Sequence, residues 1–170
     1  EKKNNISGDL TFKHKFKDQG NLNVNAHYTY FDLMRTQNVN SNYFFPDGSF
    51  IRDFNFATNA DQQIDIKTAQ IDYNDYVGSL FLETGVKGSF INSESKLDYF
   101  LNNNGSEFIP NLSDDYVYDE RVYAAYFSFS KDWEKWTLKS GLRAEQTEST
   151  GISQNVTSIN NLNYLELFPS

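Results

Sequence analysis

The chain has 170 residues, a formal net charge of −8 and no cysteine. This charge argues against a nucleic-acid partner, since no basic stripe is present to contact phosphates, and the missing cysteine excludes disulfides and thiolate metal sites. Aromatic residues make up 16% of the sequence while the mean hydropathy is −0.65, which fits a thin, extended apolar surface better than a dry globular core. No run of about 18 apolar residues predicts a membrane-spanning helix, and the composition indicates an all-β protein.

Alternation of apolar and polar residues predicts the strands. They fall at residues 6–16, 22–31, 62–74, 79–91, 121–130 and 136–148. The first strand is typical, because Ile6, Leu10 and Phe12 share one face while Lys13 and Lys15 occupy the other. Each strand therefore has one apolar and one polar face.

The third predicted strand departs from a single pattern. Ile64 and Ile66 share one face, whereas Ala69, Ile71 and Tyr73 share the other. A side-chain period of two cannot place both sets on the same face without an interruption. We expect either a β-bulge or a change of environment midway along this strand.

The connections between the strands alternate in length. Short polar segments at 17–21, 74–78 and 131–135 alternate with long segments at 32–61, 92–120 and 149–163. Loops beyond about 12–15 residues are uncommon in compact domains, but an up-and-down outer-membrane barrel has tight turns on one side and long loops on the other. Strands of roughly 10–14 residues can also cross a bilayer when tilted. The pattern predicts an antiparallel meander of about six strands, forming part of a large transmembrane β-barrel.

In such a barrel the apolar face of each strand contacts lipid and the polar face lines the lumen. The polar residues expected to face the lumen are Lys13, Lys15, His27, Glu83, Lys87, Lys139, Arg143 and Glu145. An aromatic girdle at the membrane interface is expected from Tyr73, Tyr76, Trp133 and Trp136. The alternative on pattern alone is a twisted antiparallel sheet with one face in water.

The first long segment contains an aromatic cluster around a Pro-Asp-Gly turn. The candidate ligand-binding residues are Tyr43, Phe44, Phe45, Phe50 and Phe54, and Phe56 follows them. One interpretation is a platform that stacks against a sugar or another flat ligand. The other is a hairpin whose aromatic side chains pack against one another.

No set of residues indicates catalysis, and we expect neither an enzyme nor a cofactor. The two histidines, His14 and His27, fall on opposite phases of their strands, so a shared metal or acid–base role is not expected. Asp114, Asp115 and Asp119 are close in sequence and are candidate oxygen ligands for calcium, but the EF-hand spacing is missing. Solvated acidic residues are the simpler interpretation.

Three segments of the chain carry motifs in a recognisable order. They are GDLTFKHKFKDQGNLNVNAHYTY at 8–30, ERVYAAYFSFSKDWEKWTLKSGLRAEQT at 120–147 and YLELFPS at 164–170. Together they resemble the barrel region of TonB-dependent receptor-like outer-membrane proteins of the Bacteroidetes type. The segment QIDYNDY at 70–76 fits the resemblance, although the proline expected shortly after it is replaced around Val77 and Gly78. The resemblance spans most of the chain, and the long loops are its least similar parts.

The resemblance implies a fragment of a longer receptor with a plug domain and a barrel of about 22 strands. The chain opens on Glu1 and stops at Ser170, which fits this expectation. The implied partners are outer-membrane lipid, the rest of the parent barrel and its plug, an energy-coupling protein, and a small-molecule or oligosaccharide ligand. The isolated fragment is expected to self-associate, because it exposes two strand edges and an apolar face. The expected function is ligand-gated uptake of a solute at the bacterial outer membrane.

Two alternatives remain at this level. A soluble β-sandwich or jelly-roll module could bind carbohydrate through the aromatic segment. A non-transporting outer-membrane barrel could act as an adhesin or a scaffold. A monomer that folds without detergent would favour the first, and loss of attachment rather than uptake after loop deletion would favour the second.

Overall fold

The structure is a computed structural model that describes residues 1–17, 20–102, 105–155 and 158–170. These residues form one antiparallel sheet in the order β1-β2-β3-β4-β6-β7-β8, and β5 pairs with β4. The elements are β1 (Lys2–Lys15), β2 (Asn21–Phe44), β3 (Phe50–Val77), β4 (Leu80–Leu101), β5 (Glu107–Phe108), η1 (Pro110–Leu112), β6 (Asp114–Trp133), β7 (Trp136–Ser153) and β8 (Ser158–Pro169). The predicted all-β meander is confirmed. The described residues add β8 and the two-residue β5 to the strands that were predicted.

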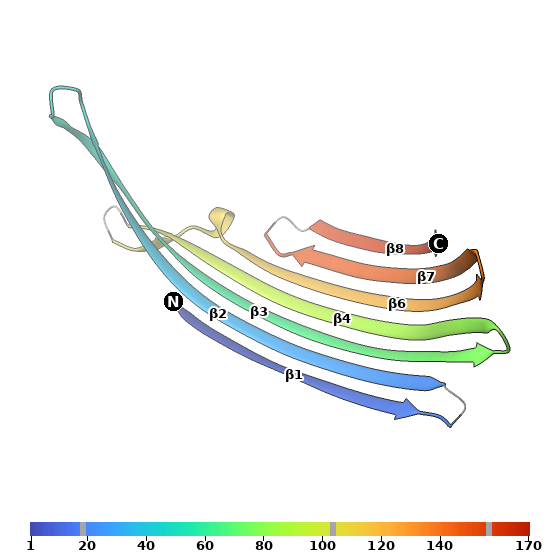
Figure 1. Cartoon of the computed structure of the whole chain (residues 1–170). Coiled ribbons are helices and arrows are strands. Elements are labelled where there is room, and N and C mark those ends of the chain that lie inside the picture. Colours follow the sequence, from blue (N-terminus) through green and yellow to red (C-terminus); the bar gives the residue numbers. More distant parts are fainter. Residues whose placement is uncertain (18–19, 103–104, 156–157) are drawn as a thin grey trace.

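Figure 1 shows a curved, open sheet in which β1 and β8 lie at opposite edges and are not joined. At one end, tight turns at 78–79 and 134–135 connect β3 to β4 and β6 to β7, and the Phe16 N–H donates a hydrogen bond to the Gly20 carbonyl between β1 and β2. Gly78 has a φ of 64°, a left-handed conformation that two-residue hairpin turns require and that glycine adopts without strain. At the other end, the hairpin of β2 and β3 projects beyond its neighbours (Figure 1).

The three predicted long loops are wrong in extent, because the strands continue through most of them. The connections are 45–49, 102–113 and 154–157, in place of the predicted 32–61, 92–120 and 149–163. Residues 18–19 of the first predicted turn, and residues 103–104 and 156–157 of the predicted loops, lie outside the described residues. The composition of these segments suggested loops, but pairing with neighbouring strands satisfies their backbone groups whatever their side chains are.

The strand register divides the side chains between two faces, because directly paired residues project to the same side of a sheet. A row of residues paired from strand to strand runs across the whole sheet, and one such row is entirely apolar: Phe12, Val24, Ile71, Val86, Ala125, Ala144 and Leu167. We call the face that carries this row the outer face. The adjacent row on the opposite side, the inner face, is mostly polar: Thr11, Asn25, Gln70, Lys87, Ala124, Glu145 and Glu166.

The apolar pattern changes face midway along β3. Ile71 and Ala69 lie on the outer face, whereas Ile66 and Ile64 lie on the inner face. The register of β3 with β2 and β4 is continuous through this region, so the suggested β-bulge is wrong here. The other alternative, a change of environment, accounts for the slip.

The same change occurs on β4 at the matching level, since Ile66 pairs with Ile91. Beyond Phe90, the outer-face residues are Asn92, Glu94, Lys96 and Asp98, and the inner-face residues include Leu97, Tyr99 and Leu101. The outer face is therefore apolar near the tight turns and polar toward the far end. The inner face has the opposite arrangement on these two strands.

The sheet has almost no buried interior among the residues that the structure describes. Ala124 is the one buried apolar residue in this part of the chain, at 6% exposure. On the outer face, Val86 is 52% exposed and Trp136 is 76% exposed. The described strands are thus held by ladders of backbone hydrogen bonds, and their apolar outer face needs an apolar surrounding.

Candidate functional site

A polar network occupies the inner face near the tight turns. Asp72 on β3 accepts hydrogen bonds from the Tyr126 hydroxyl on β6 at 2.8 Å and from the Gln70 side chain at 2.9 Å. Gly85 on β4 lies between Asp72 and Tyr126 in the register. A Cβ atom at Gly85 would overlap the Tyr126 ring and would lie 2.6 Å from Asp72 Oδ1. The glycine therefore allows Tyr126 to reach across β4 to β3.

Charged pairs continue this network toward β7. Glu83 Oε2 lies 3.2 Å from Lys139 Nζ and also accepts a hydrogen bond from the Ser128 hydroxyl. Arg143 donates a hydrogen bond from Nε to Glu145 Oε2 at 3.1 Å. Because these groups are partly exposed, the pairs contribute little to stability. They give this half of the inner face a hydrophilic, charged surface.

The register places all the residues that were predicted to face the lumen on this inner face. They are Lys13, Lys15, His27, Glu83, Lys87, Lys139, Arg143 and Glu145. His14 pairs with Leu22 on the outer face, so the two histidines lie on opposite faces as predicted. His27 lies 2.6 Å from Asp9 Oδ1 and 2.8 Å from the Thr29 hydroxyl, which gives it local partners. That these residues line a lumen stays a prediction.

The predicted girdle is only partly on the outer face. Tyr73 lies there, and Trp133 and Trp136 face each other there across the last turn. Tyr76 is one position out of phase and lies on the inner face, where its ring centroid is 4.9 Å from that of Phe81. Its inclusion in the girdle was wrong because closeness to a turn does not set the face of a strand residue.

The β2–β3 hairpin extends past the end of β1 as an arm, defined here as residues 35–60 (Figure 1). The structure separates the candidate aromatic residues on it. Tyr43 and Phe54 lie on the inner face. Phe44 and Phe50 pair on the opposite face with ring centroids 5.8 Å apart, and Phe45 lies in the connecting turn. The five residues thus do not form one platform.

Two further aromatic residues join the inner-face pair. Phe56 lies beside Phe54, with ring centroids 5.8 Å apart, and it stacks on Tyr99 of β4 at 5.2 Å. At the tip, the Arg52 guanidinium lies 4.9 Å from the centroid of the Tyr43 ring. Sequence reasoning missed Tyr99, although the inverted alternation of Leu97, Tyr99 and Leu101 was the available signal.

The structure does not bring the three calcium candidates together. Asp114 is on the inner face, where the Ser153 hydroxyl and the Asn155 backbone N–H donate to it. Asp115 and Asp119 lie on the outer face. Within the described ranges, no group of three or more His, Asp or Glu side chains is placed to hold a metal ion. No helix of this described part is long and apolar enough to cross a membrane.

Acid is expected to loosen the connection around Asp114. Hydrogen bonds from the Asn155 N–H and the Ser153 hydroxyl hold the pKa of Asp114 below its ordinary value of 3.8. Because the folded-state pKa is lowered, this stabilisation is complete above the unfolded-state pKa and is lost as the pH falls through the folded-state pKa. Amide hydrogen exchange at Asn155 should therefore accelerate below about pH 3.8, beyond the intrinsic change of rate. In Asp114→Asn the extra acceleration should disappear, and its persistence there would contradict the assignment.

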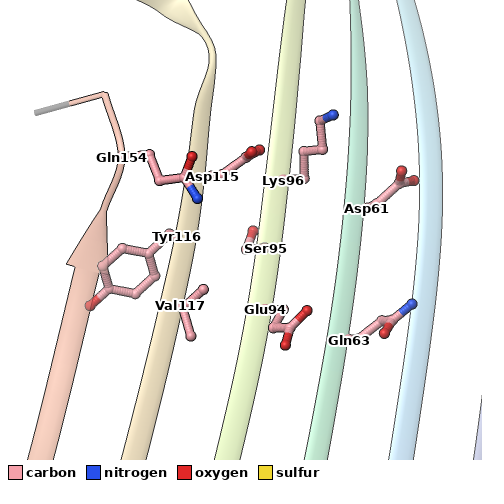
Figure 2. A pocket seen from close by; sticks show the side chains of 9 residues that line it. All are labelled: Asp61, Gln63, Glu94, Ser95, Lys96, Asp115, Tyr116, Val117 and Gln154. Atoms are coloured by element: carbon pink, nitrogen blue, oxygen red, sulfur yellow. The ribbon is translucent and has the colours of Figure 1, made fainter. Parts of the chain in front are cut away.

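A depression of about 290 Å³ lies mainly on the outer face, beyond the apolar region (Figure 2). Its lining is Asp61, Gln63, Glu94, Ser95, Lys96, Asp115, Tyr116, Val117 and Gln154. Lys96 pairs in register with Asp61 on one side and Asp115 on the other. Figure 2 shows these side chains spread over several strands rather than converging on one point. The depression has the character of a solvated, charged surface.

An antiparallel meander with an apolar outer row and a polar inner row is the arrangement of membrane-spanning β-barrels. The chain belongs to the outer membrane protein beta-barrel family, whose model matches residues 14–170. Its location is therefore the bacterial outer membrane, and the soluble alternative is set aside. The apolar stretch of β4 fits, since Leu80 to Phe90 covers about 34 Å of strand, or about 25 Å of height at barrel tilt.

Two solved structures share the fold. The unliganded ferric citrate transporter FecA aligns with a TM-score of 0.66 and 15% identity, over 98% of this chain and 24% of that one. The ferric yersiniabactin uptake receptor FyuA from Yersinia pestis aligns with a TM-score of 0.59 and 15% identity, with the same coverage of 98% and 24%. The chain thus spans about a quarter of each protein. No curated protein matches the sequence.

Proposed function

We propose that this chain is a section of a TonB-dependent receptor barrel and takes part in ligand-gated uptake of a solute. The proposal is carried by an unclosed sheet that aligns over 98% of its length with only 24% of each of two uptake proteins. In a closed barrel, β1 and β8 would pair with further strands of the same protein. Closure would remove both exposed edges, which are otherwise sites of self-association.

The two halves of the inner face have different roles in this proposal. Near the tight turns, charged residues such as Lys87, Lys139 and Arg143 contact a plug domain or the solute path. At the far end, the arm takes part in capturing the ligand outside the membrane. An energy-coupling protein acts through the parent receptor. The function is binding and passage of a solute, and no enzymatic activity is proposed.

Uptake by native cells tests the proposal. Deleting the gene for the full-length protein is expected to abolish uptake of one class of solute in a panel of siderophores, cobalamin and oligosaccharides. Dissipating the proton gradient should abolish the same uptake in cells that keep the protein. Both losses are expected because the barrel carries the ligand and the gradient drives its release.

The native product supplies the control. It should be an outer-membrane species much heavier than 19.7 kDa, resistant to SDS until it is heated. Unchanged uptake of every probe with loss of cell attachment would instead identify an adhesin or a scaffold. A soluble product near 19.7 kDa would refute the receptor assignment.

A further inference from the structure

The arm separates its charges between its two faces. On the inner face, Arg35 and Arg52 are the charged residues of the arm, while Asp53 lies on the outer face. Neither arginine forms an ion pair with any residue that the structure describes. Glu1 lies beyond the Lys2–Met34 pair and lines the same pocket as Arg35, and Glu107 of β5 pairs with Leu101 in the row of Phe56. By register, no inner-face carboxylate of the described strands lies beside Arg52. The Arg52 end of the inner face is therefore complementary to a negatively charged ligand.

Aromatic rings fill the space between the two arginines. In register order from the tip, Tyr43 is opposite Arg52, and the rings of Phe54, Phe56 and Tyr99 follow toward the sheet. Phe56 and Tyr99 are nearly parallel, with an angle of 16° between the rings. The opposite face carries asparagines at positions 38, 40, 42 and 55. Aromatic faces beside a guanidinium suit ligands that combine an apolar ring face with an anionic group.

The length of this surface indicates an extended ligand. The rows from Tyr43 to the level of Tyr99 cover about 20 Å of strand, and Arg52 and Arg35 are about 27 Å apart along the arm. A compact chelate would touch only part of such a row. A linear chain of sugar rings can place one ring after another on the aromatic side chains and direct a carboxylate to Arg52.

We propose that the inner face of the arm binds an acidic oligosaccharide, a chain of uronic acid units. Its sugar rings stack on Phe54, Phe56 and Tyr99, and a carboxylate near the tip forms charge-assisted hydrogen bonds with Arg52. This assignment rests on the proposed function, since it takes the arm as the outward-facing end of a receptor barrel. It names the class of ligand and the surface that selects it.

The test compares two forms of one ligand on the full-length protein in detergent. Oligogalacturonate and its methyl ester have the same rings, but only the first has carboxylates. Calorimetry is expected to give an affinity for the acid about tenfold above that for the ester. Arg52→Gln should reduce the affinity for the acid by about tenfold and leave that for the ester unchanged. Equal affinities of the two forms would refute the role of charge.

Two matched controls use the opposite face of the arm. Asp53→Asn adjoins Arg52 and should change the affinity by less than about twofold. Phe54→Ala should weaken both forms, whereas Phe44→Ala should weaken neither, because Phe44 is on the other face. Heat-shift electrophoresis checks that each variant is a folded barrel. Loss of barrel stability with unchanged affinity in Arg52→Gln and Phe54→Ala would identify the inner face as a packing surface and refute the proposal.

The remaining outcomes separate this proposal from the receptor function. Binding of the acid without energy-dependent uptake would support the site and refute the receptor function. Energy-dependent uptake of a siderophore or peptide that is unaffected by Arg52→Gln would support the receptor function and refute the site.

Discussion

Replacing Val86 by arginine is expected to lower the free energy of unfolding of the membrane-embedded barrel by about 2–4 kcal/mol. Val86 lies midway along the apolar outer stretch of β4 and is 52% exposed in the isolated sheet. A guanidinium there would be forced into the hydrocarbon layer, where it loses its hydration. Urea titration of the full-length protein in lipid vesicles, followed by tryptophan fluorescence, measures the change.

Asn92→Arg is the matched control for this change. It places the same side chain on the same face of the same strand, beyond the level at which the apolar pattern inverts. It is expected to lower the free energy of unfolding by only about 0–1 kcal/mol, because the side chain reaches the interface or water. Equal costs for the two variants would mean that the inversion on β3 and β4 is not the membrane boundary.

Replacing Gly85 by alanine is expected to destabilise the barrel by about 1–3 kcal/mol. The new Cβ would overlap the Tyr126 ring and would lie 2.6 Å from Asp72 Oδ1 and 2.8 Å from the carbonyl oxygen of Ile71. The backbone oxygen cannot rotate away, so the strands or the ring must shift. The hydrogen bond between Tyr126 and Asp72 should be lost as a result.

Gly88→Ala tests whether this effect is specific. Gly88 is on the same strand but on the outer face, where a Cβ would meet the Phe90 ring at an ordinary 3.5 Å. Gly88→Ala is expected to change the free energy of unfolding by less than about 0.5 kcal/mol. The double variant Gly85→Ala with Tyr126→Ala should lose less stability than the sum of the two single variants, since the overlap between the new Cβ and the Tyr126 ring is removed. An additive result would show that Tyr126 does not cross Gly85.

The half of each strand near the tight turns was predictable because its pattern is simple. Val24 and Ile71 are each flanked by polar residues on both sides, so period-two alternation identifies both the strand and its apolar face. From Ile66 toward the arm, the alternation on β3 continues with the faces exchanged and with Asn, Asp and Gln between the apolar residues. The sequence therefore suggested loops where the structure has strands, and the same inversion concealed the inner-face position of Tyr99.

The sequence by itself determined the all-β class, the up-and-down order and the separation of charged from apolar residues, because these depend on local alternation and turn chemistry. Only the tertiary structure decided the register, because pairing between strands depends on residues that are far apart in the chain. The register brings Tyr126 to Asp72 across Gly85 and Lys139 to Glu83 diagonally across β6. Unequal strand lengths, 14 residues in β1 against 28 in β3, make the arm project and leave Arg52 beside its aromatic row.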